Sequence, residues 1–121
     1  MKKYTNEEIA EIYSVKNRKL PEELVKQANS VNIMDYIEKK GLMVQKCSRG
    51  TYQLAEHDSL KITPADNVFN WYSRGEGGYG AVGFARVYFD MDFRSAVRDV
   101  MENADELVKT VDYSKYKKVE E

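Results

Sequence analysis

The chain has 121 residues, of which 20 are acidic and 19 are basic, so its formal net charge is −1. That length fits a single domain, and a hydrophobic content of 42% can supply a modest core. The nearly balanced charge excludes a protein that attracts nucleic acid over its whole surface. Any surface of that kind has to be a local basic patch.

The sequence gives no sign of a membrane segment or a secretory signal. No uninterrupted apolar run approaches the roughly 20 residues that span a bilayer, and residues 1–8 lack an apolar signal region. The single cysteine, Cys47, excludes an internal disulfide and suits a reducing compartment. We therefore expect a cytoplasmic protein without membrane contact.

Three short helices are predicted before residue 42. Thr5 and Glu8 form a capping-box pattern in front of apolar residues at helical spacing. Pro21 suits the first turn of a second helix over residues 22–28. Asn32 can cap the third helix, and Gly41 can end it.

The pattern then changes to the alternation typical of strands. Four strands are predicted, over residues 42–47, 51–54, 60–63 and 68–72, with a turn at Arg49-Gly50. Short strands joined by tight turns indicate an antiparallel meander. On the last of these strands, Trp71 is expected in the core and Tyr72 nearer the surface, since neighbouring side chains point to opposite faces.

Five of the seven glycines lie between Gly75 and Gly83. The segment matches the letters G-x-G-x-x-G, but the parallel strand or kinase elements that such a motif requires do not follow. Gly75, Gly77 and Gly78 are therefore predicted to be structural, in a tight connection between strand and helix. An alternative is that backbone N–H groups at the start of the next helix hold a phosphate.

Helical spacing returns after these glycines. One helix is predicted from about Gly80 to Phe89, and another follows Asp92 as its cap. The order of helices, sheet and helices makes the predicted class α+β, with a small antiparallel sheet of about four strands flanked by N-terminal and C-terminal helices.

Two segments of the chain resemble the zinc-ribbon module of bacterial-type DNA primases. The family reads Cys-Pro-x-His, a strand, and then Cys-x-x-Cys-Gly-x-Gly-Gly before a helix, and this chain has Leu54-Ala55-Glu56-His57 and Trp71-Tyr72-Ser73-Arg74-Gly75-Glu76-Gly77-Gly78. Two further segments, around Tyr36 and around Phe93, also look like parts of that family. The branch with the greatest similarity is the primase-like proteins of plasmids and conjugative elements.

The resemblance implies three parts. Residues 1–29 would be a helical extension, residues 30–103 the ribbon-like domain, and residues 104–121 a linker toward a C-terminal Toprim catalytic region. It also implies contact with a single-stranded DNA template during replication or mobilisation. Other possible partners are the protein's own Toprim domain, a helicase or another replication protein.

The family's four zinc-ligand positions hold Leu54, His57, Trp71 and Arg74 in this chain. Structural zinc requires four Cys or His ligands, so we expect a ribbon without metal, in which apolar packing stabilises the fold. No cofactor is expected. His57, Asp58 and Ser59 are adjacent, whereas a catalytic triad draws its members from separate elements, so no catalytic residue is expected and this fragment is not predicted to be an enzyme.

Basic and aromatic residues around the predicted sheet are the candidates for DNA binding, since aromatic rings stack on unpaired bases. A charge set of this kind can equally be an ordinary solvated surface. The leading hypothesis is a non-catalytic domain that binds single-stranded DNA, and the alternative is a protein-interaction module. The candidate residues are Lys46, Arg49, Tyr52, Lys61, Tyr72, Arg74 and Arg86.

Overall fold

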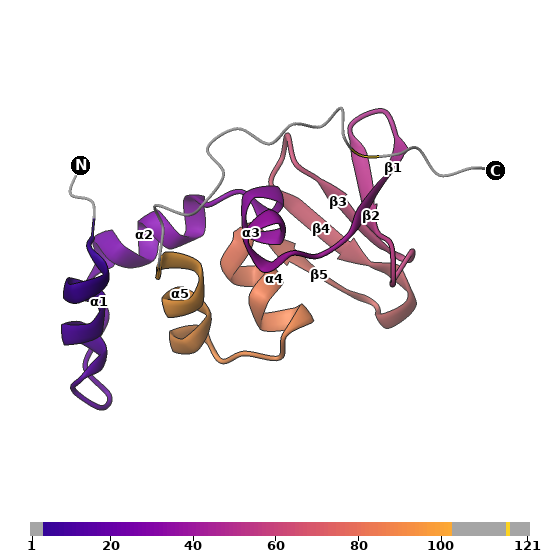
Figure 1. Cartoon of the computed structure of the whole chain (residues 1–121). Helices are drawn as coiled ribbons and strands as arrows, with labels where there is room; N and C mark the ends of the chain where they lie inside the picture. The colour runs from indigo at the N-terminus through magenta and orange to yellow at the C-terminus, as the bar shows by residue number, and fades with distance from the viewer. Residues whose placement is uncertain (1–3, 103–115, 117–121) are drawn as a thin grey trace.

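The computed structural model describes residues 4–102 and Tyr116, and it confirms the α+β prediction (Figure 1). Three helices precede an antiparallel sheet with the strand order β1-β2-β3-β4-β5, and two helices follow it. The helices are α1 (Asn6–Tyr13), α2 (Glu22–Ser30), α3 (Ile33–Lys40), α4 (Gly80–Tyr88) and α5 (Phe93–Met101). The strands are β1 (Val44–Ser48), β2 (Thr51–Leu54), β3 (Leu60–Thr63), β4 (Val68–Trp71) and β5 (Glu76–Tyr79), and a 3-10 turn, η1 (Tyr72–Arg74), follows β4.

Local capping sets the helix ends where the sequence predicts them. Thr5 and Glu8 form the complete capping box of α1. Asn32 accepts a hydrogen bond from the N–H of Met34 at the start of α3, and Gly41 ends that helix in the left-handed conformation, with φ at 72°. The Asp92 carboxylate accepts from the N–H of Ser95 and caps α5.

The fifth strand corrects the prediction of about four strands, because the segment from Gly75 to Gly78 is not only a connection. Residues 76–79 pair with β4, with Gly77 opposite Asn70. Glycine fits there because a Cβ on Gly77 would lie 2.8 Å from the carbonyl oxygen of Phe69 and 2.9 Å from Oδ1 of Asn70. The absence of side chains at these positions removed the alternation by which a strand is recognised.

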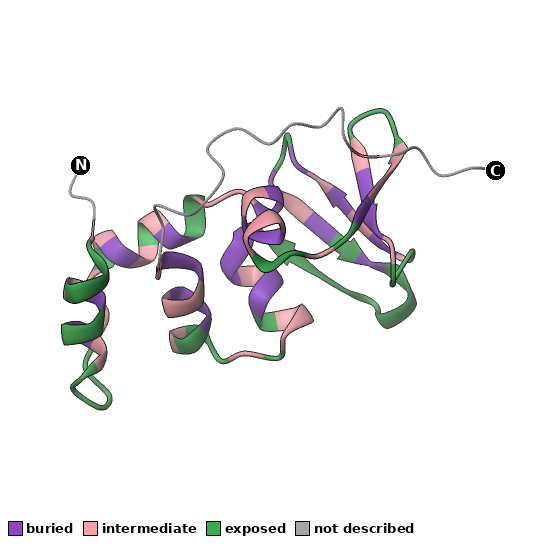
Figure 2. Cartoon of the chain, viewed as in Figure 1, coloured by how far each residue is buried: buried purple, intermediate pink, exposed green. Residues whose placement is uncertain are grey.

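The sheet has one buried face and one more polar face. Figure 2 shows buried residues alternating with less buried ones along β3 and β4. On the central strands the buried side chains alternate with partly or fully exposed ones, as expected when helices cover a single face. The buried set comprises Tyr52, Leu54, Leu60, Ile62, Phe69 and Trp71.

Helix α4 packs on the buried face of the sheet through aromatic side chains. The ring of Phe84 lies 5.5 Å from that of Phe69 on β4 and 6.2 Å from that of Tyr36 on α3, both edge to face. Such pairs add about 0.5–1.5 kcal/mol each beyond the area that they bury. Phe84 of α4 therefore contacts both the sheet and α3.

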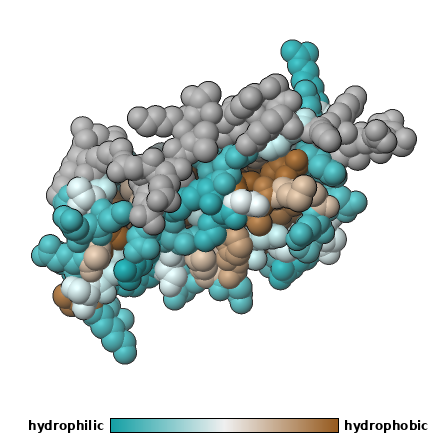
Figure 3. All heavy atoms as spheres, in the orientation of Figure 1, coloured by the Kyte–Doolittle hydropathy of each residue, from teal (hydrophilic) through white to brown (hydrophobic). Residues whose placement is uncertain are grey.

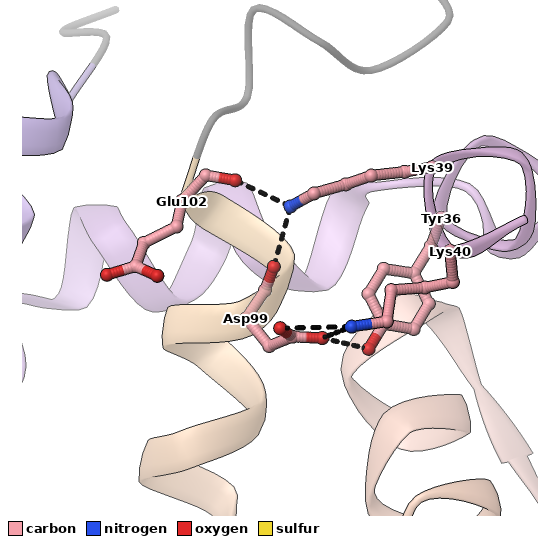
Figure 4. A network of polar contacts seen from close by, with 5 residues as sticks. All are labelled: Tyr36, Lys39, Lys40, Asp99 and Glu102. Carbon is pink, nitrogen blue, oxygen red and sulfur yellow. Dashed lines mark hydrogen bonds and ion pairs between the residues drawn. The ribbon is translucent and has the colours of Figure 1, made fainter.

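A polar network fixes α3 against α5 (Figure 4). The carboxylate of Asp99 accepts hydrogen bonds from the hydroxyl of Tyr36 and, at 3.1 Å, from the ammonium group of Lys40. Lys39 donates to the carbonyl oxygens of Asp99 and Glu102, where a cation is favoured by the C-terminal end of a helix. Burial raises the pKa of Tyr36 well above its ordinary value, and the hydrogen bond to Asp99 adds to the rise.

Asn67 connects three elements from the turn between β3 and β4. Its side-chain oxygen accepts from the N–H of Ile33 at 2.8 Å, its amide donates to the carbonyl of Val31 at 3.1 Å, and its own carbonyl accepts from the N–H of Gly80 at 2.8 Å. The residue is buried and has a φ of 55°, which asparagine tolerates better than most residues. Asn67 thus holds the starts of α3 and α4 beside the sheet.

We expect Asn67→Ala to lower the free energy of unfolding by about 2–4 kcal/mol. The substitution leaves buried backbone groups without partners and places alanine in a left-handed conformation. Urea denaturation measures the change, and Asp66→Ala at the exposed neighbouring position is the control. Equal unfolding midpoints for the two variants would contradict the role given to Asn67.

Candidate nucleic-acid interface

The four positions that correspond to zinc ligands in the resemblance meet at one end of the sheet. Leu54 ends β2, His57 lies in the turn that follows, Trp71 ends β4, and Arg74 ends η1. The N–H of His57 donates to the carbonyl of Leu54 at 3.3 Å, and the rings of His57 and Trp71 lie 5.3 Å apart. The guanidinium carbon of Arg74 lies 4.6 Å from the centre of the Trp71 ring.

These side chains do not form a metal site. Leucine and tryptophan offer no lone pair to a cation and arginine is itself a cation, so only His57 could ligate zinc. Within the part of the chain that the structure describes, no group of three His, Cys, Asp or Glu residues could hold a metal ion.

Aromatic packing fills this end of the sheet instead. Tyr88 of α4 lies 5.7 Å from His57 and 5.6 Å from Trp71, measured between ring centres, and it stacks on Phe84 at 5.2 Å. Trp71 is buried and Tyr72 is 68% exposed, which confirms the prediction for this pair. Burial raises the pKa of Tyr88, and the nearby carboxylate of Glu56 raises it further.

A cavity of about 240 Å³ adjoins this aromatic cluster. Figure 3 shows hydrophobic residues gathered over the connection between α3 and β1, where Met43 is 74% exposed. The lining residues are Gly41, Leu42, Met43, Leu54, Glu56 and Tyr88.

The structure separates the predicted DNA-binding residues into groups rather than one basic patch. Lys46 and Tyr52 are cross-strand neighbours on the same face of β1 and β2, and Arg49 occupies the turn between these strands. Arg74 and Arg86 instead line a depression of about 420 Å³ between η1, β5 and α4.

The charges in this depression are compensated. Arg74 forms an ion pair with Glu76 at 3.4 Å, and Asp90 also lines the depression. With two cations and two carboxylates, the depression offers no net attraction to a phosphate. Arg74 and Arg86 are therefore weaker candidates than the sequence suggested.

Lys61 belongs to a polar row that sequence reasoning missed. On the face of the sheet opposite the aromatic core, the register aligns Gln45, Gln53, Lys61, Asn70 and Gly77 across all five strands. Lys61 donates to the side-chain oxygen of Gln53, and Gln53 donates to that of Gln45 at 3.3 Å. The alternation of polar residues was visible in the sequence, but their alignment depends on the register.

Tyrosines flank this polar row on exposed positions. Tyr79, at the end of β5, is paired with Val68 on the same face and is 58% exposed. Tyr72 follows β4 directly. Proteins that bind single-stranded nucleic acids combine exposed aromatic rings with positively charged groups.

The start of α4 is not available for phosphate, which corrects that alternative for the glycine segment. The N–H of Gly80 donates to Asn67, and the N–H of Ala81 donates to the carbonyl of Val31 at 3.2 Å. Gly80 is buried, and a Cβ there would lie 2.8 Å from the carbonyl oxygen of Asn29. The first donors of this helix are thus used inside the protein.

A further hollow lies away from the sheet. A groove of about 660 Å³ runs between α2 and the start of α5, with Leu20, Val25 and the 38% exposed Phe93 among its walls. Arg94 also lines the groove, and its guanidinium group donates to the carbonyls of Val15 and Arg18.

No protein-family model and no solved structure matches the chain. The chain is 33% identical over 85 residues to pXO2-78, an uncharacterized protein of Bacillus anthracis. The match covers 70% of this chain but only 24% of the other protein, so the chain spans about a quarter of that relative's length.

None of the helices in the described residues has the length and apolar character needed to cross a membrane. The predicted linker over residues 104–121 lies, apart from Tyr116, outside the described residues.

Trp71→Ala should lower the free energy of unfolding by about 3–5 kcal/mol, because it removes the ring on which Tyr88, His57 and Arg74 pack. Tyr72→Ala, one residue along at an exposed position, should change it by less than about 0.5 kcal/mol. Urea denaturation followed by circular dichroism compares the pair. Similar losses in both variants would show that the aromatic cluster does not stabilise this end of the sheet.

Proposed function

We propose that this chain is a non-catalytic, primase-like domain that binds single-stranded DNA without zinc. The polar face of the sheet supports the proposal best. It presents Lys61 and Asn70 between two exposed tyrosines, Tyr72 and Tyr79. Tyrosine rings can stack on unpaired bases, whereas Lys61 can contact the phosphate backbone.

The balanced net charge is compatible with binding that depends on stacking more than on phosphate contacts. Each stacked base contributes about 1–3 kcal/mol, so the two tyrosines supply part of the binding free energy and phosphate contacts such as that of Lys61 supply the rest. The position of the chain within a larger replication protein, with a Toprim catalytic region after it, belongs to the same proposal.

The expected result is binding of a labelled oligonucleotide of about 16 nucleotides that weakens as salt rises. Tyr72→Ala and Tyr79→Ala should each weaken binding by about 1–3 kcal/mol. Lys61→Ala should reduce the slope of log affinity against log salt concentration by about 1, the value for one lost phosphate contact. Fluorescence anisotropy measures the affinities, with Lys16→Ala in the loop after α1 as the control.

Absence of binding at about 50 mM salt and tens of micromolar protein would contradict the proposal for this domain. Binding that survives both tyrosine substitutions would place the DNA on a different surface.

The groove between α2 and α5 favours a second candidate function, a protein-interaction module. A partly apolar groove of about 660 Å³ has the size of a binding site for a partner's side chains. In that case the oligonucleotide does not bind, and the partner is the Toprim domain or another replication protein.

A further inference from the structure

Tyr116 packs between Tyr52 of the β1–β2 hairpin and Glu38 of α3, and the space that its ring fills is termed the slot. Its ring lies 5.6 Å from that of Tyr52, at an interplanar angle of 66°. Its hydroxyl donates a hydrogen bond to the carboxylate of Glu38 on α3. Tyr116 lies far along the chain from both Tyr52 and Glu38.

The slot has the chemistry of a nucleobase site. Tyr52 offers an aromatic surface, and the Glu38 carboxylate accepts a hydrogen bond from the edge of the ring that enters. Cytosine and adenine carry an exocyclic amino group that can donate to such a carboxylate, whereas thymine carries none. Lys46 lies directly across from Tyr52 on the same face of the sheet, within reach of the phosphate that accompanies a base.

We propose that the slot formed by Tyr52, Glu38 and Lys46 is a base subsite for single-stranded DNA, which Tyr116 fills in the free protein and leaves when an amino-bearing base enters. This proposal rests on the proposed function. It assigns Tyr52 and Lys46 a common site, distinct from the polar face that carries Lys61. Tyr116 then competes with the base within the same molecule. The apparent affinity for the base equals the intrinsic affinity multiplied by the fraction of molecules in which the slot is free.

The test compares oligo-dC and oligo-dT binding to the full chain and to Tyr116→Ala. We expect Tyr116→Ala to bind oligo-dC roughly 3–10-fold more tightly than the unchanged protein, with a smaller gain for oligo-dT. Tyr116→Phe, which loses only the hydrogen bond to Glu38, should give an intermediate gain. Glu38→Gln in the Tyr116→Ala background should abolish the preference for oligo-dC.

Nuclear Overhauser contacts between the rings of Tyr52 and Tyr116 provide a readout that does not depend on the measured affinity. They should be present in the free protein and disappear on saturation with oligo-dC. Circular dichroism verifies that the variants are folded.

Each failure has a different meaning. Oligonucleotide binding by the unchanged protein, with no gain in Tyr116→Ala or with ring contacts that persist in the complex, overturns the slot but leaves the proposed function standing. Absence of binding by both the unchanged protein and Tyr116→Ala overturns both proposals.

Discussion

Aromatic packing of α4 on β4 is the interaction on which the arrangement of this domain depends. Phe84 and Tyr88 present their rings to Phe69 and Trp71 respectively, at centre distances of 5.5 and 5.6 Å. Trp71 in turn supports His57 and Arg74. One helix face therefore determines where the β2–β3 turn, η1 and the exposed Tyr72 lie.

This packing is the physical basis on which the proposed primase-like domain would fold without metal. A coordinated zinc ion typically contributes on the order of 10 kcal/mol to the folding of a small domain. Trp71 and Leu54 alone fall short of that, since burying one large side chain is worth about 1.5–3 kcal/mol. The hydrogen bonds of Asn67 add a link between the sheet and α3, and the contacts of Asp99 join α3 to α5.

The sequence predicted those features that depend on neighbouring residues. The caps at Thr5, Asn32 and Asp92 follow from side chains that bond to backbone within three residues, and the burial of Trp71 follows from strand alternation. Strand β5 was missed because two of its four residues are glycines and carry no pattern.

Features that depend on distant contacts were beyond sequence reasoning. The pairing of Lys46 with Tyr52 was not deduced, because it requires the register of β1 on β2. The ion pair of Arg74 with Glu76 is local, between residues two positions apart, and it was missed because a count of charges does not show which of them meet. The contact of Tyr116 with Tyr52 joins residues far apart in the sequence, and no local pattern marks it.

Metal analysis of the purified protein, together with thermal unfolding in the presence and absence of a strong chelator, tests the central claim most directly. The account predicts less than stoichiometric zinc and the same unfolding temperature in both conditions. One tightly held zinc ion per chain, with unfolding when the chelator removes it, would show that a coordinated cation and not aromatic packing holds this end of the sheet.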